Sequence, residues 1–285
     1  MRTEKEILEL IVSIAKNDDR ILAVIMVGSR ANEEIPKDKY QDFDIAYIVN
    51  DVKPFYNNMK WIEENFGKPL IFQLPEDMSP EIFQPIGDGH FTALMIFNDG
   101  IRIDLTIDKN YDPDIDKGEP AIILLDKIGL LKLLNIDKNY WYVKPPTPKL
   151  FYDCCNEFWW CLNNVVKGIA RDELPYAMNM YNCIVRDMLD KMIEWYVGVN
   201  YDFSVSTGKN GKYFRKLLPK EIYEKYKKTY SDSEYSNFWD SLYAVNELFH
   251  ITAEKVAKYL NVEYNQNEED GMIKYMNMIR NDCIE

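Results

Sequence analysis

The sequence predicts an α+β protein, in which an N-terminal domain with a mixed sheet is followed by an all-helical C-terminal bundle. Two observations predict this fold class. Up to about residue 107, short apolar runs alternate with polar residues at the two-residue period of strands. From about Pro148 onward, apolar residues recur every three or four positions, as they do in packed helices. We therefore expect two domains, which span residues 1–145 and 146–285.

The N-terminal elements follow from the spacing of their apolar residues. Ile7, Ile11 and Ile14 recur at helical spacing, so an opening helix is expected before the polar residues that begin at Asn17. The next apolar run is short and closes at Gly28, which is typical of a buried strand. The elements expected after the opening helix are a strand over 21–27, a strand over 42–49, a helix over 54–66 and a brief strand over 70–72.

A hairpin and a series of helices complete the prediction. The apolar runs 91–97 and 101–107 flank an Asn-Asp-Gly turn at 98–100, and this arrangement is typical of a hairpin. In the second run, Ile103 lies on one face of the strand and Asp104 on the other. Apolar stripes at helical spacing follow within 158–169, 178–192 and 238–256.

Composition and charge exclude several classes of protein. Among 285 residues, 34 Lys and Arg oppose 47 Asp and Glu, for a net charge of −13. This balance opposes binding to nucleic acid or to anionic membranes, because both need basic side chains that displace counterions, whereas it favours a cationic partner. No apolar run is long enough to span a membrane, and the five cysteines include an adjacent pair. We expect a soluble cytoplasmic protein with reduced thiols.

Three aspartates are the strongest candidates for chemistry. Asp42 and Asp44 are two apart on a predicted strand, so their side chains point the same way, about 6 to 7 Å apart at the backbone. Asp104 has the same phase on its own strand. If the two strands are neighbours, three carboxylates converge on an oxygen-ligand site that suits Mg²⁺. The alternative is that the Asp-x-Asp pair only faces solvent at a strand edge.

A Gly-Ser pair follows the first predicted strand. Small residues at Gly28 and Ser29 expose backbone N–H groups that can bind phosphate oxygens. The segment is not a Walker A loop, because the residues after Gly28 do not complete the pattern GxxxxGK[ST]. The sequence therefore predicts a phosphate-binding turn and supports neither a kinase nor a P-loop ATPase.

Seven stretches together are more specific than these signals. They are GSRAN, DKYQDFDIAYIV, QLPEDM, IRIDLTI, VKPPTP, DCCNEFWWCLNNVVKG and WYVGVNYDFSVSTGKNGKY. In order and spacing they resemble the aminoglycoside 6-adenylyltransferases, also called streptomycin adenylyltransferases, of the DNA polymerase β-like nucleotidyltransferase superfamily. The resemblance covers nearly the whole chain. It implies Mg²⁺-dependent transfer of AMP from ATP to a hydroxyl of the antibiotic, with release of pyrophosphate.

The resemblance also implies roles for single residues. Gly28 and Ser29 would hold the triphosphate, and Asp42 and Asp44 would bind Mg²⁺, which offsets charge in an in-line displacement. Asp104 could complete the metal site, accept the proton of the attacking hydroxyl, or do both, and both roles stay open.

Three basic residues are candidates for contacts with the nucleotide phosphates. Arg30 directly follows the Gly-Ser pair, and its alternative is a surface pairing with Glu33 or Glu34. Lys167 interrupts an apolar helical stripe, and Lys209 lies in the glycine-containing segment STGKNGKY. In the wider superfamily a lysine of the C-terminal domain contacts the triphosphate. The resemblance therefore implies such a role for Lys167 or Lys209.

A cationic antibiotic would need a pocket lined by carboxylates. The candidate acids are Glu76 and Asp77 in the QLPEDM loop, and Asp153 and Glu157, which share a helix face because they are four residues apart. Each of them could equally be a solvated surface acid.

Two rival functions keep the fold but change the activity. One is transfer to another acceptor, such as a nucleic-acid end or a protein side chain, and the net charge of −13 opposes the nucleic-acid form. The other is a non-catalytic module that binds nucleotide or antibiotic.

Overall fold

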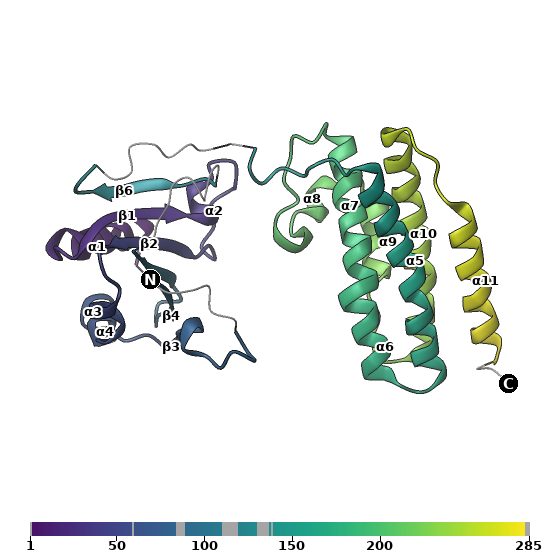
Figure 1. Ribbon diagram of the computed structural model, residues 1–285, viewed down its shortest axis with the longest axis horizontal. Coiled ribbons are helices and arrows are strands. Elements are labelled where there is room, and N and C mark those ends of the chain that lie inside the picture. Colours follow the sequence, from purple (N-terminus) through teal and green to yellow (C-terminus); the bar gives the residue numbers. More distant parts are fainter. Residues whose placement is uncertain are drawn as a thin grey trace. The chain divides into compact units, whose positions relative to one another are not determined.

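The computed structural model describes residues 2–58, 60–83, 89–109, 119–129, 137 and 139–282. Within it the chain divides into two compact units, Met1–Tyr140 and Trp141–Glu285. The first contains a mixed sheet with helices, and the second contains helices (Figure 1). The predicted α+β class is confirmed. The division lies a few residues before the boundary expected after residue 145.

In the described residues of the N-terminal unit, six strands form one sheet in the order β3-β4-β5-β2-β1-β6. β2 and β5 are parallel, whereas the other neighbours are antiparallel, so the sheet is mixed. The hairpin is confirmed as β4 and β5. The edge strand β6 was not predicted, because its short apolar run follows an Asp- and Pro-rich loop. The strands are β1 (Ile21–Val27), β2 (Phe43–Val49), β3 (Ile71–Gln73), β4 (His90–Ile96), β5 (Arg102–Asp108) and β6 (Ile122–Asp126).

The first helix of this unit begins at a capping residue. Thr3 caps α1 reciprocally, since its hydroxyl accepts from the Glu6 backbone N–H and the Glu6 carboxylate accepts from the Thr3 N–H (2.7 Å). The single helix predicted over 54–66 is wrong, because α3 ends at Tyr56 and its C-cap is Asn57, a residue type that favours caps and turns. The elements are α1 (Glu4–Asn17), α2 (Gly28–Ala31), α3 (Lys53–Tyr56), α4 (Lys60–Phe66) and η1 (Pro75–Asp77).

The two faces of the sheet differ in what covers them. On one face, buried side chains of α1, α3 and α4 pack with the alternate strand residues Phe43, Ile45 and Tyr47 in one apolar cluster. The Tyr47 hydroxyl donates to the Ile11 backbone oxygen (2.7 Å), which fixes α1 to this face. Among the described residues, the opposite face carries a small apolar cluster from β1 and β2 together with Ala121, which directly precedes β6. Its remaining positions on β2 and β5 are polar, and they include the predicted aspartates.

The C-terminal unit is a helical bundle, as predicted. Its core includes Phe158 of α5 stacked on Phe249 of α10, with 3.7 Å between ring centroids. Four cysteines of this unit are free thiols, three of them buried. Within the described ranges, no helix combines the length and apolar character needed to cross a bilayer. The elements are α5 (Pro148–Ala170), α6 (Leu174–Met180), η2 (Tyr181–Val185, a π-helical turn), α7 (Arg186–Asn200), η3 (Lys209–Gly211), α8 (Phe214–Leu217), α9 (Lys220–Lys228), α10 (Tyr235–Leu260) and α11 (Gln266–Asp282).

Candidate active site

The parallel pairing of β2 and β5 brings two of the predicted aspartates together. Asp44 and Asp104 are direct partners in the register, so their side chains stand on the same face of neighbouring strands, about 5 Å apart at the backbone. Asp42 lies two residues before Asp44, just ahead of β2. The sequence predicted this convergence only on condition that the two strands are neighbours, and the register meets that condition.

Arg102 links the carboxylates of two strands. Its Nε and Nη2 donate to the two carboxylate oxygens of Asp104 at 2.8 and 2.7 Å. Its Nη1 lies 3.5 Å from Oδ2 of Asp42. A bidentate fork of this kind fixes the orientation of the guanidinium on the carboxylate. This role was not predicted from the sequence. The signal for it was the two-residue spacing of Arg102 and Asp104, which places both side chains on the same face of one strand.

The three aspartates suit a divalent cation by their chemistry. In the part of the chain that the structure describes, no three Asp, Glu, His or Cys side chains are already gathered around a common point that would hold a metal ion. Instead, Asp42 and Asp104 share the guanidinium of Arg102, a cation from the chain itself. Three carboxylates on one side of two adjacent strands are oxygen donors of the kind that Mg²⁺ prefers, so the residues fit this ion.

Asp42, Asp44 and Asp104 form an aspartate cluster, and its electrostatics indicate a shortage of positive charge. Burial raises the pKa of Asp44 to about 6, and the carboxylates of Asp104 and Asp42 add to the rise. Burial also raises the pKa of Asp42; Arg102 opposes this rise and Asp104 adds to it. A further positive charge at this place would therefore stabilise the ionised carboxylates.

Gly28 lies against the same cluster. The residue before it, Val27, is the register partner of Asp44, so the strand delivers Gly28 beside that carboxylate. Its φ of +71° is a conformation that L side chains rarely adopt, and an added Cβ would lie 2.3 Å from Oδ2 of Asp44. Only glycine fits here. Ser29 follows in α2, and the Gln41 amide donates to its backbone oxygen and hydroxyl at 3.5 Å.

Arg30 faces the protein rather than the solvent. The residue is only 6% exposed, and its Nε and Nη2 donate to the backbone oxygens of Asp42 (3.0 Å) and Gln41 (2.8 Å). Nη1 lies 3.2 Å from Oε2 of Glu4, and the guanidinium covers the Phe43 ring at 3.9 Å. Its acidic partner is thus Glu4, and not Glu33 or Glu34. These contacts tie the segment before β2 to α2.

The comparisons with known proteins agree over nearly the whole chain. A family model described as streptomycin adenylyltransferase matches residues 1–279. The chain belongs to this family. The aminoglycoside 6-adenylyltransferase of Bacillus subtilis (strain 168) is 38% identical over 280 residues, which cover 96% of this chain and 97% of that protein. The resemblance inferred from the sequence motifs is confirmed, as is the prediction of a nucleotidyltransferase enzyme.

Two further proteins of the same description are similar along almost their full length. The aminoglycoside 6-adenylyltransferase of Staphylococcus aureus is 37% identical over 286 residues, which cover 99% of both chains. That of Campylobacter jejuni is 38% identical over 271 residues, covering 93% of this chain and 91% of the other. A crystal structure of an aminoglycoside 6-adenyltransferase from Bacillus subtilis matches with 32% identity and a TM-score of 0.49, covering 98% of this chain and 99% of that one.

The two predicted acids of the N-terminal unit, Glu76 and Asp77, lie in η1 and have partners within the chain. Glu76 in η1 accepts from the backbone N–H of Thr92 (3.0 Å) and lies 3.4 Å from Nε2 of His90. Asp77 accepts from the Tyr56 hydroxyl (2.8 Å). Thr92 belongs to β4, two positions along the strand from the register partner of Asp104. Glu76 is therefore held against the sheet, and its side chain is only 10% exposed.

The other predicted residues lie on the C-terminal unit and are described by themselves. Asp153 is exposed on α5 and forms an ion pair with Lys149 one turn earlier. Glu157 is also exposed, and its carboxylate accepts from the Cys161 thiol (3.3 Å). Lys167 is half-buried on the same helix, and Lys209 is exposed in η3.

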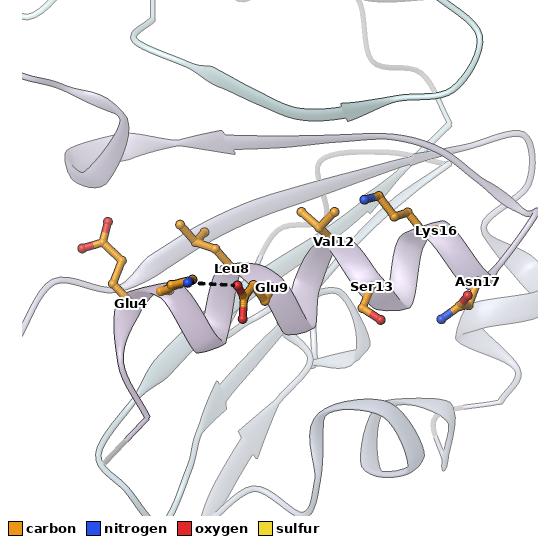
Figure 2. A pocket seen from close by; sticks show the side chains of 8 residues that line it. Glu4, Leu8, Glu9, Val12, Ser13, Lys16 and Asn17 are labelled. Carbon is orange, nitrogen blue, oxygen red and sulfur yellow. Dashed lines mark ion pairs between the residues drawn. The ribbon is translucent and has the colours of Figure 1, made fainter.

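A groove of about 730 Å³ runs along the exposed side of α1 (Figure 2). All of its described lining residues come from that one helix, and a Lys5–Glu9 ion pair (3.7 Å) crosses it. It contains none of the predicted site residues, so it is not the candidate site in this adenylyltransferase-family chain. The lining residues are Glu4, Lys5, Leu8, Glu9, Val12, Ser13, Lys16 and Asn17.

Proposed function

We propose that this protein transfers AMP from ATP to a hydroxyl of an aminoglycoside of the streptomycin type and releases pyrophosphate. The observation that carries the proposal is the register match of Asp44 with Asp104 beside Gly28, with Asp42 joined to the pair through Arg102. Membership of the streptomycin adenylyltransferase family, and relatives named as aminoglycoside 6-adenylyltransferases, support the choice of donor and acceptor.

The three aspartates would hold Mg²⁺, and Asp104 would serve both as a ligand and as the general base. The metal supplies charge compensation at the phosphates when it is bound. Asp104 stands beside Asp44 at the same level of the sheet, so a proton accepted from the attacking hydroxyl would be received next to the other carboxylates. A carboxylate is a weak base in water, so this role depends on position.

The nucleotide would be held by several groups. The backbone at Gly28 and Ser29 would contact the triphosphate, because no side chain at Gly28 blocks the approach of a phosphate. Arg30 would act by tying α2 to the segment before β2, since its nitrogens are already engaged with the chain. Lys167 and Lys209 remain the proposed lysine contacts from the C-terminal unit.

The acceptor is a cation, and the charge of the chain favours its capture. A net charge of −13 attracts a molecule that carries several ammonium or guanidinium groups. Glu76 is the strongest of the four proposed acceptor contacts, because it is fixed by Thr92 on β4 and already lies beside the imidazole of His90. Asp77, Asp153 and Glu157 would add negative charge to the acceptor's surroundings. We propose cytoplasmic action, where ATP is available.

The test is direct detection of the product. Purified protein is incubated with ATP, Mg²⁺ and a panel of aminoglycosides, and mass spectrometry looks for antibiotic that has gained AMP. The expected result is modified streptomycin together with pyrophosphate. Asp44→Asn should remove the product, whereas Asp19→Asn, which makes the same charge change at an exposed position, should retain it.

Two other outcomes would overturn this proposal in favour of a rival. Unmodified drug and no pyrophosphate across the panel would contradict aminoglycoside adenylylation. Tolerance to streptomycin that survives Asp44→Asn in cells would indicate a protein that sequesters the drug.

A further inference from the structure

We propose that Arg102 is a built-in competitor for the metal site, a role that rests on the proposed function. Its guanidinium pairs with the carboxylates of Asp42 and Asp104. It must release both before they can bind a divalent cation. The affinity of the free protein for the metal is therefore lower than three carboxylates alone would give.

The geometry leaves little room for sharing. Both oxygens of Asp104 accept hydrogen bonds from Arg102, at 2.8 and 2.7 Å, so one lone pair on each oxygen is engaged by the guanidinium. The contact to Oδ2 of Asp42 at 3.5 Å places the same guanidinium between two strands. A divalent cation bound by Asp42 and Asp104 would lie close to the positive charge of the paired guanidinium, and the two cations would repel each other.

The guanidinium is free to leave. The Arg102 side chain is 42% exposed, whereas that of Asp104 is 17% exposed, so the arginine can turn into solvent while the carboxylate stays in place. Arg30, the other arginine near the cluster, is 6% exposed and held by three groups of the chain. Of these two arginines, Arg102 is thus the one that can exchange with a metal ion. It is a positioning residue, because it acts through Asp42 and Asp104.

The chain contains a matched control for this fork. Arg20 and Asp18 are also two residues apart, and Nε and Nη2 of Arg20 donate to the two oxygens of Asp18 at 2.8 and 2.5 Å. This second fork lies at the end of α1, away from the aspartate cluster. Arg20→Gln therefore removes an equivalent bidentate pair without touching the proposed site.

The experiment measures Mn²⁺ binding by the purified full chain, without nucleotide or antibiotic, from the electron paramagnetic resonance signal of free Mn²⁺. We expect Arg102→Gln to bind Mn²⁺ about three- to tenfold more tightly than the wild type, because an ion pair of this kind contributes modestly. Arg20→Gln should bind as the wild type does. In the double variant that carries both Arg102→Gln and Asp44→Asn, the gain in Mn²⁺ affinity should disappear. This result would assign the gain to the aspartate cluster.

Arg102→Lys keeps the positive charge but cannot form the two parallel hydrogen bonds to Asp104. It is the test variant to use if circular dichroism shows that Arg102→Gln does not fold. Its Mn²⁺ affinity should lie between those of the wild type and Arg102→Gln. An Arg102→Gln affinity equal to or weaker than that of the wild type would overturn the inference. So would a gain that survives Asp44→Asn. The titration requires no AMP transfer, so failure of the proposed function alone would leave this result intact.

Discussion

The two faces of the N-terminal sheet differ although they share the same strands. In β2, Phe43 is 1% exposed and packs beneath the helices, whereas the next residue, Asp44, faces the opposite side among other carboxylates. In β5, Ile103 and Asp104 repeat this contrast. The alternation of strand side chains thus places the apolar core on one face and the carboxylates on the other. We therefore expect substitutions on the apolar face to lower the free energy of unfolding, and substitutions on the carboxylate face to lower the rate of AMP transfer.

The largest expected effect is on the rate of AMP transfer, for a substitution on the aspartate face, the face of the sheet that carries Asp44 and Asp104. Asp44→Asn should lower the rate of AMP transfer about a thousandfold or more, because it removes a charge needed where charge develops in the reaction. Its free energy of unfolding should be unchanged or higher, because one of three mutually repelling carboxylates is neutralised. Single-turnover kinetics and urea unfolding measure the two quantities. A variant that is inactive because it unfolds would contradict the separation of the two faces.

The opposite effect is expected one residue earlier. Phe43→Ala should lower the free energy of unfolding by about 3–5 kcal/mol, since it opens a cavity in the cluster beneath α1 and removes the ring below Arg30. Phe72→Ala is the control, because Phe72 is 40% exposed on the edge strand β3 and should change stability little. Equal losses in the two variants, measured by urea unfolding, would refute the assignment of the core to the helix-covered face.

Gly28 directly follows β1 and lies against the Asp44 carboxylate. Gly28→Ala should reduce AMP transfer by about 10–100-fold, because its Cβ would displace the Asp44 carboxylate. Gly67→Ala is a close control, since Gly67 also has a positive φ (+87°) but nothing lies within 4 Å of its added Cβ. Both variants should lose about 1 kcal/mol of stability from backbone strain. A loss of transfer as large in Gly67→Ala would assign the effect to strain and not to Asp44.

The smallest expected effect is on stability, and it concerns His90 at the start of β4. Asp108 raises the pKa of His90 above its usual 6.5, and Glu76 adds to the rise. The protonated imidazole thus adds stability that is fully present below pH 6.5 and is lost as the pH rises through the folded-state pKa. After solvent screening, this contribution is below about 1 kcal/mol.

His90→Gln should therefore be less stable than the wild type at pH 6, and the difference should disappear by about pH 8.5. Urea unfolding at the two pH values measures it. A difference that grows with pH would show that the imidazole is not stabilised by these two acids.

Much of the fold could be predicted because the apolar period is unambiguous where strands and helices are long. The run 21–27 predicted a strand with the observed bounds, and the apolar stripe of α1 predicted a helix that ends in the polar run beginning at Asn17, as observed. β6 was not predicted because its four apolar residues, Ile122 to Leu125, carry no distinctive period, and only pairing with β1 defines them as a strand. The break between α3 and α4 depends on local capping at Asn57, which competes weakly with apolar spacing in a sequence.

The candidate site was predictable in its acids but not in its contacts. The phase of Asp44 and Asp104 follows from strand alternation, while their partnership needs a parallel pairing that the sequence alone does not specify. Arg30 was expected to contact phosphates or Glu33 and Glu34, yet its contacts are with Glu4 and backbone oxygens of the segment before β2. Such contacts depend on how α1 and α2 meet in three dimensions.

We propose that the aspartate face of the sheet binds the catalytic metal. Crystals grown with Mn²⁺ and a non-hydrolysable ATP analogue test it most directly through the anomalous signal of manganese. The account predicts a peak within ligand distance of Asp42, Asp44 and Asp104, with Arg102 no longer forked on Asp104. A manganese peak elsewhere, with the Arg102–Asp104 fork intact, would contradict it.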